Sequence, residues 1–231
     1  MRLMKRVSAA CALAILLGVS ASDSNGARNT WDYLVPVRKE TGSGAAYERL
    51  WRQKLLVTNG EIARFVGLPG NVGEETSVSI YRRTIHDGND QYWVTATQAS
   101  ERLSNAIPQP GVNKTVDPQK IAIQRCDAPL PDSTAITIRH VWIAMLSQIR
   151  AEPKSDAITI DSSTEIFSAI DASGKLLQGQ TSSKPGKDSL ALVELALSLM
   201  EYCDAPASRR VDKAREIERE ATDLLNRVSK R

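Results

Sequence analysis

The side chains best suited to chemistry are few in this sequence, which has three cysteines and two histidines among 231 residues. Cys126 stands between a short apolar run and a loop that contains Pro129 and Pro131. A cysteine in such a place could act as a nucleophile, a metal ligand or one half of a disulfide. The cellular compartment and the neighbouring residues decide between these roles.

The N-terminus has the pattern of a secretory leader. Basic residues within the first six positions precede an apolar run from Val7 to Val19. The run is short for a bilayer span, which needs about 20 residues, and Val19, Ser20 and Ala21 are the small residues that signal peptidase accepts. We predict a signal peptide over residues 1–21; the alternative is an anchor helix that stays in place. No second long apolar run follows, so we expect no stable membrane insertion after cleavage.

Export determines how the cysteines are interpreted. Cys11 lies inside the leader, so Cys126 and Cys203 are the thiols of the mature chain. An even pair in an oxidising compartment most simply forms a disulfide, and free structural thiols are the alternative. Zinc needs three or four ligands, and the sequence has no CxxC, HExxH or histidine-rich cluster. We predict a disulfide between Cys126 and Cys203, with no metal, cofactor or catalytic residue.

The histidines offer a weak catalytic alternative. His86 is followed by Asp87, but both stand at a predicted hairpin turn, where polar residues need no special explanation. His140 lies opposite the apolar stripe of a predicted helix, so we expect it at the surface. The segment KPGKDS, residues 184–189, precedes a helix start that could attract an anion, but it lacks the P-loop spacing. A turn with a helix cap is the simpler interpretation.

The charge balance does not favour nucleic-acid binding. The formal net charge is +3, and the three basic residues of the leader account for all of it. The mature chain is therefore formally neutral, and we expect no nucleic-acid partner.

The periodicity predicts an α+β fold. A helix begins at Ser43, and its apolar stripe is Tyr47, Leu50, Trp51 and Leu55. A strand follows at 61–65, and the runs 76–86 and 91–99 form a hairpin. A second helix runs from about Asp132 to Arg150, and its apolar stripe is Ile138, Trp142, Met145, Leu146 and Ile149. Three strands at 157–160, 164–170 and 175–181 follow it as a meander. A third helix ends at Cys203, and its expected buried side is Leu190, Val193, Ala196, Leu197 and Met200. We expect an antiparallel sheet with helices packed on one face, a flexible lead-in at 22–42 and a single domain over 43–204.

The segment 205–231 is predicted to be a charged amphipathic helix. Its apolar residues follow the 3-4-3-4 spacing of a narrow helical seam, namely Ala214, Ile217, Ala221, Leu224 and Val228. Such a seam either packs on its own domain or binds a partner. For the second case Ile217 and Leu224, with the basic Arg215 and Arg219 beside them, are the predicted partner-binding residues.

These observations favour a non-enzymatic periplasmic or secreted protein that acts by binding another protein. Inhibitors, immunity factors and accessories of envelope machines belong to this class. The expected partner is another envelope protein or a second copy of the chain, and the expected surfaces are the C-terminal helix and the loop from Pro108 to Gly111. The alternative is a hydrolase of unrecognised type that uses carboxylates or the His86–Asp87 corner.

Overall fold

A computed structural model describes residues 32–56, 60–70, 72–84, 90–108, 116–151, 163–182 and 184–231. The predicted leader and the predicted strand at 157–160 lie outside these residues. Within them, four α-helices and six strands follow one another as α1 (Ser43–Leu55), β1 (Glu61–Leu68), β2 (Thr76–Thr84), β3 (Asp90–Ala99), β4 (Ile123–Pro129), α2 (Asp132–Leu146), β5 (Thr164–Ile170), β6 (Leu176–Gln180), α3 (Lys187–Asp204) and α4 (Ala207–Val228). The α+β class is confirmed.

The strands form one antiparallel sheet in the order β4-β3-β2-β1-β5-β6. The predicted hairpin is confirmed as β2 and β3, which pair from Thr76 opposite Gln98 to Thr84 opposite Asp90. The predicted strands at 164–170 and 175–181 are also confirmed, as β5 and β6. Residues far apart in the sequence therefore meet at the centre of the sheet, where β1 pairs with β5.

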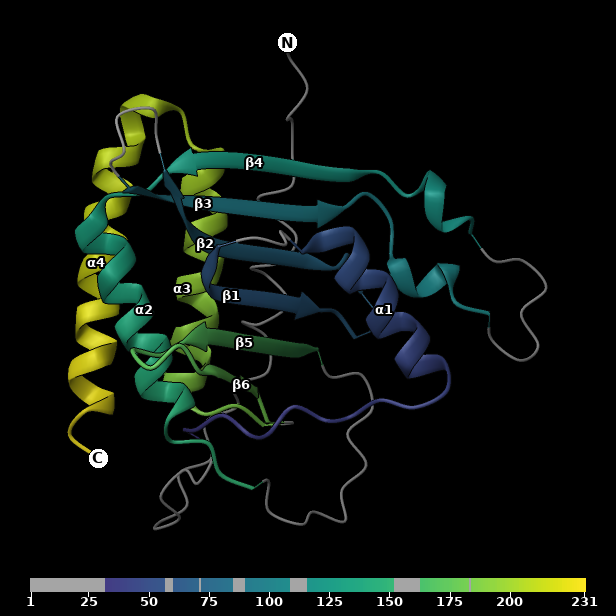
Figure 1. The fold of residues 1–231 in the computed structure, drawn as a ribbon, viewed down its shortest axis with the longest axis horizontal. Coiled ribbons are helices and arrows are strands. Elements are labelled where there is room, and N and C mark those ends of the chain that lie inside the picture. The colour runs from purple at the N-terminus through teal and green to yellow at the C-terminus, as the bar shows by residue number, and fades with distance from the viewer. Residues whose placement is uncertain are drawn as a thin grey trace, which may run out of the picture.

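The first face of the sheet carries the main core. Phe65 of β1 lies opposite Phe167 of β5, and Trp142 of α2 meets the Phe167 ring edge-on at 5.5 Å. Helices α2 and α3 cover this face, with α3 crossing behind the strands in Figure 1, and α4 packs on both of them. Alternation along each strand directs these large side chains toward the helices.

Helix α1 covers the other face, which differs from the prediction that all helices pack on one face. Val66 and Ile166 alternate with the two phenylalanines, so they point away from the main core. They pack instead with Leu50, Trp51 and Leu55 of α1 in a second cluster. Figure 1 shows α1 in front of the sheet and α3 behind it. Both faces of this sheet carry apolar side chains that must be buried, which explains why helices pack on both faces.

The predicted disulfide between Cys126 and Cys203 is confirmed, with 5.9 Å between the Cα atoms. It joins the middle of β4 to the last turn of α3. The sequence suggested an apolar run and a loop around Cys126, whereas the structure forms an edge strand there. The burial of its side chains does not alternate cleanly, because the adjacent Gln124 and Arg125 are both exposed, so seven residues gave no recognisable strand pattern.

The segment before α1 and the C-terminal helix are both part of the domain. Leu34 and Val35 are buried, and Val35 exchanges two backbone hydrogen bonds with Gln180 of β6. Residues 32–35 of the predicted flexible lead-in are therefore packed, whereas 38–42 are exposed. The five seam residues of α4 are buried as well, with Ile217 2% and Leu224 1% exposed. No helix of the described residues has the length and apolarity required to cross a bilayer.

Candidate functional site

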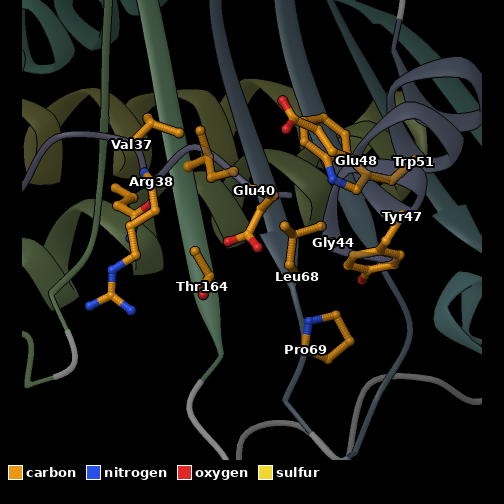
Figure 2. Close-up of a pocket in the computed structure, with 12 residues that line it drawn as sticks. Val37, Arg38, Glu40, Gly44, Tyr47, Glu48, Trp51, Leu68, Pro69 and Thr164 are labelled. Atoms are coloured by element: carbon orange, nitrogen blue, oxygen red, sulfur yellow. The ribbon is translucent and has the colours of Figure 1, made fainter. Parts of the chain in front are cut away.

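A pocket of about 240 Å³ opens beside α1, between that helix, the segment 37–40 and the ends of β1 and β5. We name it the α1 pocket. Figure 2 shows the side chains that line it, which come from all of these elements. Its apolar side is formed by Val37, Trp51, Leu68 and Ile166, and its polar side by Glu40 and Tyr47.

The sequence positions the pocket through the alternation of β1 and β5 and the period of α1. Leu68 and Ile166 lie on the sheet face that α1 covers, and Trp51 is on the buried side of α1. Tyr47 lies one turn before Trp51, at the edge of that buried side, where it is only partly exposed. The pocket thus lies at the edge of the second core cluster, where α1 no longer covers the sheet.

Tyr47 is held in place by the buried Glu75. Its hydroxyl donates a hydrogen bond of 2.7 Å to Glu75 Oε1, and the backbone N–H of Leu103 donates to Glu75 Oε2 at 2.8 Å. Burial is the main cause that raises the pKa of Tyr47 well above its ordinary value, and the hydrogen bond to Glu75 adds to it. Tyr47 therefore stays protonated, and the donation of its one O–H to Glu75 fixes its ring as part of the wall.

Carboxylates give the rim of the α1 pocket its charge. Glu40 is exposed, and its side chain points into the pocket in Figure 2. Glu48 also lines the pocket and forms an ion pair of 2.7 Å with Arg52, one turn further along α1. Arg38 also lines the pocket, so the rim carries one guanidinium beside these two carboxylates. The excess of carboxylates among the lining side chains favours a ligand with a basic group, while the floor favours an apolar one.

The α1 pocket offers carboxylates, hydroxyl groups and an apolar floor to a ligand. None of the described residues that line it is a histidine, cysteine, serine or lysine. Its volume lies below the roughly 300–1,000 Å³ of typical small-molecule sites. It is large enough for one apolar side chain of another protein, and such pockets are common anchor points of protein interfaces.

A second, more open hollow of about 350 Å³ lies where β4 leads into α2. Its polar groups are used within the chain: the Tyr202 hydroxyl donates to the Pro129 carbonyl, and Arg210 donates to the carbonyls of Cys203 and Ala205. Because these contacts hold the turn between α3 and α4, we assign the hollow to the scaffold.

The predicted partner-binding residues do not share one surface. Ile217 and Leu224 pack in the main core against α2 and α3, because the seam of α4 fills the groove between those helices. Arg215 and Arg219 are exposed on the outer side of α4. Within the described residues, the apolar partner of the seam is the chain's own domain.

Several other candidates from the sequence lie apart from the α1 pocket. His86, Asp87, Pro110 and Gly111 fall outside the described residues, while Pro108 is described and exposed. His140 is exposed on α2, as expected.

At the KPGKDS segment, the backbone N–H of Asp188 donates to Asp32 Oδ1 at 3.0 Å. The chain's own carboxylate thus occupies the helix start that was considered for an anion.

Sequence reasoning identified the residues of the α1 pocket as part of a helix stripe but not as a site. Tyr47 and Trp51 were expected to be core residues, and the spacing alone cannot show where the cover of a sheet ends. Within the described ranges, no group of three or more His, Cys, Asp or Glu side chains is placed to hold a metal ion. No protein-family profile, curated protein or solved structure matches the chain.

Proposed function

We propose that this chain is an exported, non-enzymatic protein that binds another protein, and that the α1 pocket receives an apolar side chain of the partner beside a basic one. The observation that carries the proposal is the pocket itself. An apolar floor of side-chain size lies under a rim where the carboxylates of Glu40 and Glu48 outnumber the guanidinium of Arg38.

The structure around the pocket suits this role. The hydrogen bonds from Tyr47 and Leu103 to the buried Glu75 fix the wall before a partner arrives. A pocket that is already formed spares the partner the cost of ordering it. The leader pattern and the disulfide support export, because disulfides persist in oxidising compartments.

The test uses the protein with an intact disulfide as bait in a displayed peptide library. We expect enrichment of peptides with one large apolar residue next to lysine or arginine. Binding of an enriched peptide should shift the indole N–H signal of Trp51 in NMR spectra, assigned with the Trp51→Phe variant.

Glu40→Lys and Glu101→Lys form a matched pair of variants, because both carboxylates are exposed but only Glu40 lines the pocket. We expect Glu40→Lys to lose the enriched peptides and Glu101→Lys to keep them. Equal binding by both variants, or enrichment of acidic peptides, would contradict the proposal.

A further inference from the structure

The two edge strands of the sheet differ in whether another segment of the chain pairs with their outer side. The β6 edge is covered, because Val35 N–H donates to the Gln180 carbonyl at 2.8 Å and Gln180 N–H donates to the Val35 carbonyl at 2.9 Å. The β4 edge is the other end of the strand order, and no strand of the described residues pairs with its outer side. Unpaired edges are templates for pairing with another chain.

The backbone groups on this open edge can be identified. Leu130 N–H donates to the Tyr92 carbonyl at 2.9 Å, and Ser100 N–H donates to the Ala122 carbonyl at 2.8 Å. Even-numbered residues of β4 therefore direct their backbone groups toward β3. Because these directions alternate along an antiparallel strand, the N–H and C=O groups of Arg125 and Asp127 point outward.

The outward residues carry opposite charges, placed symmetrically about Cys126. If a second copy pairs antiparallel with Cys126 opposite its own counterpart, Arg125 faces Asp127 of the second copy, and Asp127 faces its Arg125. A shift of the pairing by two residues in either direction also keeps the backbone hydrogen bonds. It places Arg125 opposite Arg125 of the second copy, or Asp127 opposite its Asp127. Like charges directly opposite each other destabilise a strand pair, so charge selects one register.

We propose that two copies of this chain associate through their β4 strands, about a two-fold axis at Cys126, into one continuous sheet. Arg125 and Asp127 exchange their outward backbone hydrogen bonds with the second copy. The exposed fractions of these side chains, 48% and 37%, leave them accessible, and their mutual 2.9 Å ion pair keeps them on the same face of the strand.

Two further features fit this interface. The disulfide to Cys203 holds the centre of β4 against α3, so the edge is fixed before association. Pro129 ends the strand without an N–H group, which limits the pairing to a short ladder. The inference is independent of the α1 pocket, which none of the β4 residues line.

The experiment measures mass by sedimentation velocity over a concentration series of the oxidised protein. We expect the wild type to dimerise. Arg125→Asp alone and Asp127→Arg alone should each be monomeric, with a dimer dissociation constant raised by about tenfold or more, because two attractive cross-strand pairs become repulsive. An equimolar mixture of the two variants should dimerise again, since each outward charge then faces its opposite.

Controls separate association from folding. Arg215→Asp changes the same charge on exposed α4 and should leave the dimer intact. Arg125→Asp retains the Thr95 and Tyr81 hydrogen bonds to Asp127, and circular dichroism checks that both variants are folded. A wild type that is monomeric at every concentration, variants that still dimerise alone, or folded variants that fail to pair when mixed would each overturn the proposal.

Discussion

Arg227 of α4 donates a hydrogen bond of 2.9 Å from Nε to Oδ1 of Asp188, in the first turn of α3. The Asp188 side chain is only 5% exposed, and Arg231 binds its other oxygen. A buried carboxylate at a helix N-terminus thus connects α3 to the end of α4. The helix dipole also favours the negative charge at this position.

We predict that Asp188→Asn lowers the free energy of unfolding by about 1.5–3 kcal/mol, the cost of losing hydrogen bonds to a charged group. Urea unfolding followed by circular dichroism measures it. The control is Asp212→Asn, which removes one half of an exposed pair with Arg215 and should change stability by less than about 1 kcal/mol. Equal effects of the two substitutions would show that Asp188 has no special role.

The disulfide should contribute strongly to stability. It links residues 77 positions apart, and closing a loop of this length in the unfolded chain is worth about 4 kcal/mol by the chain-entropy argument. We expect the double variant Cys126→Ser with Cys203→Ser to lose most of this amount in urea unfolding. Reduction of the wild type should give a similar loss. A midpoint unchanged by reductant, with reduction verified by mass spectrometry, would exclude this contribution.

Helix α4 should behave as a core element of the domain. Leu224 is 1% exposed in the main core, so Leu224→Ala should cost about 2–5 kcal/mol. Val211 is 57% exposed on the same helix, and Val211→Ala should have little effect. Thermal unfolding of both variants tests the contrast, which would be absent if α4 were a loosely attached tail.

The pH dependence of stability should include a contribution from Asp127. Burial alone would raise the pKa of this carboxyl, but hydrogen bonds from Arg125, Thr95 and Tyr81 outweigh it and lower the pKa below its ordinary value. A carboxyl whose pKa is lower in the folded state stabilises the protein above its unfolded pKa. That stabilisation is lost as the pH falls through the folded value.

The comparison with Asp127→Asn isolates this carboxyl. In dilute protein, the stability advantage of the wild type should be constant above about pH 5 and should shrink below about pH 4. Urea unfolding across this range provides the measurement. Parallel curves for the two proteins down to acidic pH would contradict the assignment.

The sequence was most informative where one apolar stripe dominates a helix. The 3-4-3-4 spacing of α4 predicted its buried residues, since charged side chains occupy most of the other positions. Four stripe residues expected on α2 are buried as well, namely Ile138, Trp142, Met145 and Leu146. The fifth, Ile149, is only partly buried, because the helix ends at Leu146 and not near Arg150. In α4 a single arrangement hides the seam, so the period alone is sufficient. In α2 the period was less complete, because Val141 outside the predicted stripe is also buried while Ile136 is 41% exposed.

Helix α3 shows where the period fails. The expected buried side included Leu190 and Leu197, which are 39% and 40% exposed, whereas Leu192 and Leu199 are fully buried. The helix is rich in leucine and contacts both the sheet and α4, so several stripes fit its sequence equally well. The choice between them depends on tertiary contacts that no local pattern encodes.

The candidate site was beyond the reach of the sequence for a related reason. The period of α1 indicated which of its residues are buried, but not which face of the sheet would bury them. The α1 pocket exists because α1 covers only part of that face. The outward charges of β4 became meaningful once the strand order placed this strand at an edge.

The contacts at Asp188 have a consequence for the connectivity of the fold. Asp32, the first described residue, and Arg231, the last, meet there, because Arg231 donates to the Asp32 carbonyl and forms an ion pair of 3.6 Å with its carboxylate. The end of α4 and the segment that precedes α1 are thus neighbours in the fold. A circular permutant that joins residue 231 to residue 32 through a short glycine linker, and opens between β5 and β6 at the exposed turn near Gly174, should keep the same sheet.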